Sequence, residues 1–142
     1  MNFNLDGPAL RSTAIISYAN WLTANSNATF VTNTLWPIIK LDLDYVSTFW
    51  NQSRYRYAHS LVYFPYKFLW NNSFDLWEEV NSSSFFTTAV QHRALREGIT
   101  LAQKIGQTSV VSDYTTQADN ILCFLQVRMV PKGTQTRLIY YD

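Results

Sequence analysis

The stretch FDLWEEVNSSSFFTTAVQHRALREG, residues 74–98, determines how the rest of the chain is interpreted. It opens with three carboxylates and two large apolar side chains: Asp75, Leu76, Trp77, Glu78 and Glu79. Serines then lead into a helical pattern of apolar residues. Apolar cover and nearby like charges both raise the pKa of a carboxyl group, so one acid can stay protonated near neutral pH, as glycoside hydrolysis requires. On the carboxylates alone, a solvated loop before a helix N-cap is the favoured interpretation.

The whole stretch is more specific than its carboxylates. It closely resembles the catalytic-acid segment of glycoside hydrolase family 15, the fungal glucoamylases. That pattern is an aromatic residue, DLWEEV, a small polar run, FFT and AVQHRAL, and residues 74–80, 85–87 and 89–95 match it in order and without a gap. The resemblance implies an all-α fold, a portion of an (α/α)6 barrel in which hairpin loops at one end form the active site.

The resemblance also implies a reaction, the inverting hydrolysis of terminal α-1,4-linked glucose from the non-reducing ends of starch. Glu78 matches the general acid, the proton donor, and Asp75 matches an aspartate proposed as proton acceptor. The implied substrate-binding residues are Trp77, Glu79 and Leu76. An inverting site also needs a carboxylate base. The base of the family is a glutamate far downstream that nothing here matches, and Glu97 is unsuitable because it lies within a helix. We therefore expect the chain as written to be inactive.

Composition narrows the classes of partner. The formal net charge of 142 residues is +1 and charged residues make up 15%, which gives no nucleic-acid footprint. No apolar run is long enough to span a membrane. We expect a monomer acting on starch and maltooligosaccharides. The alternative is a non-catalytic carbohydrate-binding or helical interaction fragment, which the 16% of aromatic residues would suit.

The N-terminal residues, the glycosylation sequons and the cysteine and histidine counts predict the cellular compartment and the need for a cofactor. The N-terminus lacks a basic region followed by an apolar one, so we expect no signal peptide in this chain. Glycosylation sequons at Asn27, Asn51, Asn71 and Asn81 nevertheless predict a secreted parent enzyme. One cysteine and two isolated histidines cannot build a metal site, and we expect no cofactor. His92 is interpreted as a hydrogen-bonded structural residue.

The first half of the chain predicts two helices. Residues 6–22 form the first, with Asp6 as cap and Pro8 in the first turn. Its apolar stripe is Leu10, Ala14, Tyr18 and Trp21 or Leu22. Residues 25–34 are expected to be a polar loop. The second helix places Leu35, Ile39, Leu43, Val46 and Trp50 on one face, with Asp42 and Asp44 on the solvated face.

The second half predicts two more helices. Residues 84–106 form the third, with serines at its start, Gly106 at its end and a stripe of Leu95, Ile99, Ala102 and Ile105. Residues 109–116 are expected to be a polar connection. A fourth helix begins at residues 117–126, and its Cys123 is expected to be a small buried hydrophobe.

Two segments fall outside the family pattern. Residues 6–53 and 74–126 of this partial catalytic domain resemble the family, whereas 54–72 is an atypical insertion and 127–142 an atypical tail. Residues 54–72 carry no acidic residue and no clean periodicity. A sugar-binding aromatic loop and a genuine surface insertion are both possible, but we favour retained intron sequence for this segment, and intron or out-of-frame sequence for the tail.

This interpretation makes a prediction for the gene. Splice donor and acceptor signals should lie in the genomic DNA near the codons for Arg54 and Val127, with family-like sequence resuming beyond them. Sequencing of the locus and of its messenger RNA measures this directly. A mature messenger that reads through residues 54–72 would contradict the interpretation.

Overall fold

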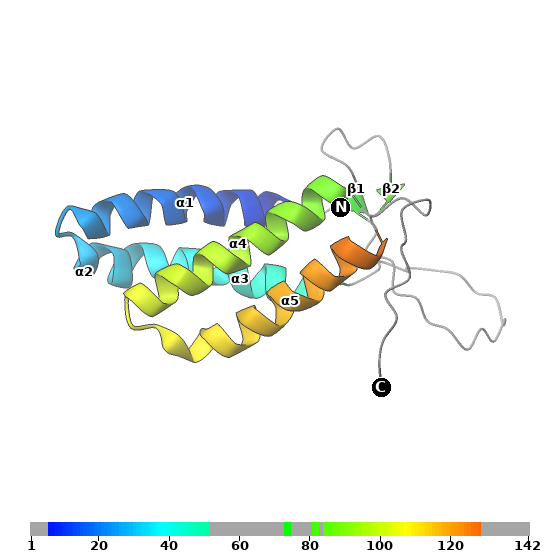
Figure 1. Cartoon of the computed structure of the whole chain (residues 1–142). Helices are drawn as coiled ribbons and strands as arrows, with labels where there is room; N and C mark the ends of the chain where they lie inside the picture. Colours follow the sequence, from blue (N-terminus) through cyan, green and yellow to red (C-terminus); the bar gives the residue numbers. More distant parts are fainter. Residues whose placement is uncertain (1–5, 52–72, 75–80, 83, 129–142) are drawn as a thin grey trace, which may run out of the picture.

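The computed structural model describes residues 6–51, 73–74, 81–82 and 84–128. Four long helices dominate this part of the chain (Figure 1). The helical elements are α1 (Gly7–Ala24), α2 (Ala28–Phe30), the π-helix η1 (Val31–Leu35), α3 (Trp36–Phe49), α4 (Phe85–Lys104), the 3-10 turn η2 (Thr108–Val110) and α5 (Val111–Arg128). Strands β1 (Ser73–Phe74) and β2 (Asn81–Ser82) form one short antiparallel ladder. The predicted all-α class is confirmed.

Helix α4 is the centre of the bundle, because it packs against α1, α3 and α5. Successive long helices run in opposite directions, so the starts of α1 and α4 and the ends of α3 and α5 lie at one end of the bundle (Figure 1). The core that these helices share includes Ile16, Ile39, Leu43, Leu95, Leu101, Tyr114 and Ile121.

Helix α1 was predicted with nearly correct bounds but with the wrong face towards the core. Leu10, Tyr18 and Trp21 are exposed. The buried face instead carries Ala9, Ser12, Ile16, Ala19 and Leu22. Both faces are rich in apolar residues, so helical periodicity alone could not select one. Asp6 occupies the N-cap position, but its side chain makes no capping hydrogen bond.

The polar loop predicted at residues 25–34 is wrong. Only residues 25–27 form a turn, and α2 and η1 then lead directly into α3. Val31 is fully buried and fixes this segment against the core. Thr32 donates a hydrogen bond to the Ala28 carbonyl at 3.1 Å, so a residue that favours loops is accommodated in a helix here.

The buried face of α3 agrees with the prediction, but the predicted solvation of Asp42 is wrong. The Asp42 carboxylate is 2% exposed and accepts two hydrogen bonds from the guanidinium of Arg11, one from Nε at 2.8 Å. A buried charge requires such a partner. Asp44 is half-exposed and accepts hydrogen bonds from Lys40 and, at 2.6 Å, from the Tyr114 hydroxyl.

Helix α4 matches its prediction closely at both ends. The Ser84 hydroxyl accepts a hydrogen bond from the Thr87 amide at 3.4 Å, and Gly106 ends the helix with a positive φ of 76°. Gly98 lies on the buried face, where a Cβ atom would overlap Leu43 Cδ1. The absence of a side chain at Gly98 therefore allows α4 to lie close against α3.

The polar connection predicted at residues 109–116 is also wrong, since α5 begins at Val111. Tyr114 is buried, and the hydroxyls of Thr115 and Thr116 bond back to carbonyls one turn earlier. Cys123 is exposed rather than buried. The apolar residues around it are not all on one face, and Ile121 takes the core position.

The environment of His92 on α4 keeps its imidazole neutral. Burial lowers the pKa of His92 from its ordinary value of 6.5, Arg96 lowers it further, and Asp119 opposes both. The expected hydrogen bond is not found at Nε2, which is buried with no partner among the described residues. A proton added at this buried atom would have no acceptor among the described residues.

Gly98 and Leu43 provide a test of the helix packing. In the native background Gly98→Ala should lower the free energy of unfolding, because overpacking costs about 1–3 kcal/mol and exceeds the gain of about 1 kcal/mol in helix propensity. In a Leu43→Ala background the same change should raise stability by about 1 kcal/mol, because space is then available. Urea unfolding of the four proteins measures both effects. A Gly98→Ala effect of the same sign in both backgrounds would contradict the proposed contact.

His92 should make stability depend on pH. Its pKa is lower in the folded state, so the unfolded chain binds the proton more tightly. The His92 contribution is therefore fully present above pH 6.5 and is lost as the pH falls towards the folded pKa. Urea unfolding at about pH 7.5 and about pH 5.5 should show a smaller loss for His92→Gln than for the native chain. An equal loss in both would show that His92 does not contribute.

Candidate functional site

The β1–β2 ladder flanks residues 75–80, the segment that carries the predicted catalytic residues. Ser73 pairs with Ser82 and Phe74 pairs with Asn81. The ladder lies at the end of the bundle where α1 and α4 begin (Figure 1). Paired residues of an antiparallel ladder have Cα atoms about 4.5–5.5 Å apart. The two ends of the segment that carries the predicted carboxylates are therefore held side by side.

The predicted catalytic and substrate-binding side chains lie outside the described residues. These are Asp75, Leu76, Trp77, Glu78 and Glu79. The atypical insertion at 54–72 and most of the tail at 127–142 also lie outside them. The roles proposed for these residues, and the division of the chain into family-like and atypical parts, stay predictions.

The first turns of α4 carry buried polar side chains close to the ladder. Thr87, Thr88 and Gln91 are each at most 1% exposed. The Thr88 hydroxyl bonds to the Ser84 carbonyl at 2.9 Å, whereas Thr87 Oγ1 has no partner in the described part of the chain. Buried polar atoms are costly to leave unpaired, so they commonly bond to water or to a neighbouring segment.

Asp6 is a candidate that the sequence interpretation treated only as a helix cap. It lies at the start of α1, at the same end of the bundle as the ladder, and it is 1% exposed. Its Oδ2 atom has no hydrogen-bond partner within the described residues. A buried carboxylate oxygen can accept a hydrogen bond from a ligand hydroxyl. Only its burial, which periodicity does not reveal, distinguishes Asp6 from an ordinary N-cap residue.

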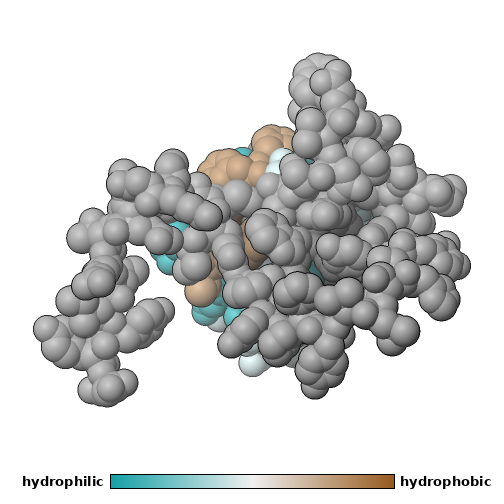
Figure 2. All heavy atoms as spheres, turned by 90° about the vertical axis from the view of Figure 1, so that its right-hand side faces the viewer, coloured by the Kyte–Doolittle hydropathy of each residue, from teal (hydrophilic) through white to brown (hydrophobic). Residues whose placement is uncertain are grey.

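Exposed apolar side chains lie at the same end of the bundle as Asp6 and Thr87. Figure 2 views the molecule from the ladder end, and hydrophobic surface is visible there beside hydrophilic surface. Phe85 and Phe86, the first two residues of α4, are 62% and 43% exposed. Exposed aromatic faces next to polar groups are typical of binding surfaces.

At the end of the bundle where the ladder lies, side chains at the end of α3 contact α5. Trp50 Nε1 donates to Gln117 Oε1 at 2.9 Å, and the Trp50 ring packs edge-on against Phe124 at a centroid distance of 6.3 Å. Further along, Ser47 donates to Asp113 at 2.6 Å. Burial raises the pKa of Tyr114, and its hydrogen bond to Asp44 raises it further, so the hydroxyl stays protonated and donates.

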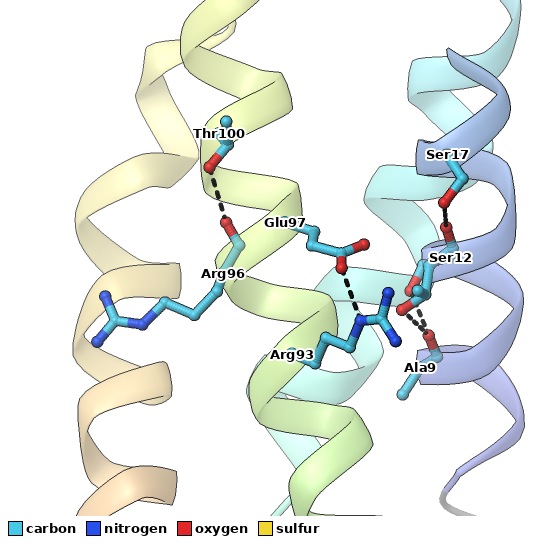
Figure 3. Close-up of polar contacts among 8 residues, drawn as sticks. Ala9, Ser12, Ser17, Arg93, Arg96, Glu97 and Thr100 are labelled. Atoms are coloured by element: carbon cyan, nitrogen blue, oxygen red, sulfur yellow. Dashed lines mark hydrogen bonds and ion pairs between the residues drawn. The ribbon is translucent and has the colours of Figure 1, made fainter. Parts of the chain in front are cut away.

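Glu97 is not positioned as a catalytic base. It lies within α4, and its Oε1 accepts a hydrogen bond from Arg93 Nε at 2.6 Å (Figure 3). Arg96, on the same helix, pairs with Asp119 of α5. Glu97 thus lies within a helix, as predicted, and forms an ion pair with Arg93.

Across the ranges that the structure describes, no three His, Cys, Asp or Glu side chains gather as metal ligands would. No helix in the described ranges combines the length and apolar character needed to cross a membrane.

A family profile, individual relatives and a solved structure all match this chain. The profile of the family described as glycosyl hydrolases family 15 matches residues 2–56 and 60–142. The match includes residues 54–56 and 60–72 of the atypical insertion and all of the atypical tail at 127–142. The interpretation of these segments as retained intron or out-of-frame sequence stays a prediction.

Individual relatives agree with the family match. Glucoamylase-1 of Schizophyllum commune is 50% identical over 121 residues, and Glucoamylase P of Amorphotheca resinae is 45% identical over the same length. Each alignment covers 85% of this chain but only 17% and 16% of the relative. The solved structure of Hormoconis resinae glucoamylase superimposes with a TM-score of 0.68 at 41% identity, over 87% of this chain and 17% of that one.

The family is thus shown by the sequence match, and the structural match agrees with the predicted portion of an (α/α)6 barrel. The chain spans only about a sixth of the length of these relatives. The chain belongs to glycosyl hydrolase family 15.

Proposed function

We propose that this chain is part of a glucoamylase that hydrolyses terminal α-1,4-linked glucose from the non-reducing ends of starch and maltooligosaccharides, with inversion. The family match carries this proposal, because it includes the whole stretch at residues 74–98. It favours an enzyme over a non-catalytic carbohydrate-binding or interaction fragment. The relatives named above are glucoamylases by name.

The proposed mechanism assigns one proton to one carboxyl group. Glu78 donates its proton to the glycosidic oxygen as the bond to glucose breaks, while a carboxylate base removes a proton from the attacking water. In inverting enzymes these two groups lie about 6.5–9.5 Å apart, which leaves room for that water. Leu76 and Trp77 provide apolar surroundings in the sequence, and Asp75 and Glu79 add negative charge. Both effects favour the protonated form of Glu78.

The remaining residues of the segment are proposed to hold the sugar. Trp77, Glu79 and Leu76 bind the glucose unit, and Asp75 is a proton acceptor near the acid. The ladder supports this proposal because Phe74 and Asn81 fix both ends of the segment beside α4.

The base is proposed to lie outside this chain. Glu97 is engaged with Arg93 on α4, and no other glutamate in the described residues is available for that role. A site with an acid but no base cannot activate water. The chain of 142 residues is therefore expected to release no glucose from starch, whereas the full-length parent releases it. We further propose that the parent is a secreted monomer that binds neither nucleic acid nor membranes.

Substitution of the proposed acid tests the function. In the full-length parent, Glu78→Gln keeps shape and hydrogen-bonding capacity but removes the proton, so starch hydrolysis should fall by about 10²–10⁴-fold. Binding of maltotriose, measured by titration calorimetry, should be nearly unchanged. Glu79→Gln should instead weaken binding and turnover together, because its proposed role is to hold the sugar.

Glu97→Gln is the matched control, since it makes the same chemical change at a surface ion pair. It should retain native turnover, because such pairs contribute little. Near-native starch hydrolysis by a folded Glu78→Gln protein would rule out Glu78 as the acid.

A further inference from the structure

The turn between α1 and α2 is continuously exposed. Every residue from 24 to 30 is exposed to solvent. The turn is held by backbone bonds from the Asn25 amide to the Trp21 carbonyl at 3.1 Å and from the Asn27 amide to the Leu22 carbonyl at 3.0 Å. Ser26 between them has a positive φ of 63°. The turn is therefore ordered and projects into solvent.

Asn27 is the first residue of an Asn-Ala-Thr sequon in this turn. Its backbone is not helical, with φ of −115° and ψ of 39°, and its side chain makes no capping hydrogen bond to α2. The neighbouring Asn25 differs, because its Nδ2 atom donates to the Trp21 carbonyl at 2.8 Å. The Asn27 amide is thus accessible, whereas the Asn25 amide is engaged.

The Asn27 sequon differs from the other three in its third residue and in being described and exposed throughout. It is the only one of the four sequons that has threonine rather than serine at its third position. All three of its residues are described and exposed. In Figure 1 the α1–α2 turn lies at the end of the bundle opposite the β1–β2 ladder. A bulky group on Asn27 would therefore leave the candidate site open.

We propose that Asn27 carries an N-linked glycan in the mature protein. Asn27 Nδ2 forms a bond to C1 of the first N-acetylglucosamine of a lipid diphosphate-linked oligosaccharide. The bond from that C1 to the diphosphate oxygen breaks, the lipid diphosphate leaves, and the amide nitrogen loses one proton. The inference rests on the secretion proposed above and is independent of the hydrolase activity.

Glycan mapping of the full chain tests the proposal. The chain is directed into the secretory pathway of a yeast by a heterologous signal sequence, with an Asn-Gly-Thr acceptor added at its C-terminus. Trypsin cuts after Arg11 and Lys40, so the peptide 12–40 contains Asn27 and no other sequon. Glycosidase treatment in heavy-oxygen water should convert Asn27 to labelled aspartate, which mass spectrometry detects.

Two variants should abolish the label on this peptide, Asn27→Gln and Thr29→Ala, and the intact protein should lose one glycan in each. Asn25→Gln is the matched control and should leave the label unchanged, because residues 25–27 do not form a sequon. Only molecules that carry a glycan on the added acceptor are scored, so every molecule scored has met the transferase. An unlabelled Asn27 in those molecules would overturn the proposal, whereas inactivity towards starch would bear only on the proposed function.

Discussion

The close approach of α3 and α4 at Gly98 and Leu43 is the constraint on which the bundle depends. Leu43 is fully buried and fills the space that a side chain on Gly98 would occupy. Because α4 also packs against α1 and α5, its position relative to α3 fixes all four long helices. The start of α4, and with it the adjoining ladder, is held at one end of the bundle by this contact.

Two aspartates of α3 add directional bonds to this packing. Asp42 pairs with Arg11 of α1, and Asp44 accepts from Tyr114 of α5. Asp42 is buried, and a buried carboxylate without its partner would destabilise the fold, so the bond to Arg11 favours one arrangement of α1 and α3. Helix α3 is therefore bonded to α1 through Asp42 and to α5 through Asp44. Thr87 and Asp6, which are buried, owe that burial to how these helices pack.

The sequence predicted the elements better than their surroundings. Helix α4 could be predicted with both ends because Ser84 and Gly106 are local signals that need no tertiary contact. The buried face of α1 and the burial of Asp42 could not, because both depend on which helix packs opposite. The carboxylates at 75–79 were found by motif. Asp6 was identified from its burial and from its Oδ2 atom, which has no partner in the part of the chain that the structure describes. Tertiary packing, which a linear pattern does not contain, decides the buried face of α1 and the burial of Asp42 and Asp6.

We propose that this bundle supports the acid half of an inverting glycosidase site. The configuration of the first glucose released by the full-length parent tests it most directly, because inversion and retention give opposite anomers from the same α-linked substrate. Proton NMR of the reaction with maltotriose, recorded before the released sugar mutarotates, should show β-glucose as the first product. Initial release of α-glucose would contradict the account.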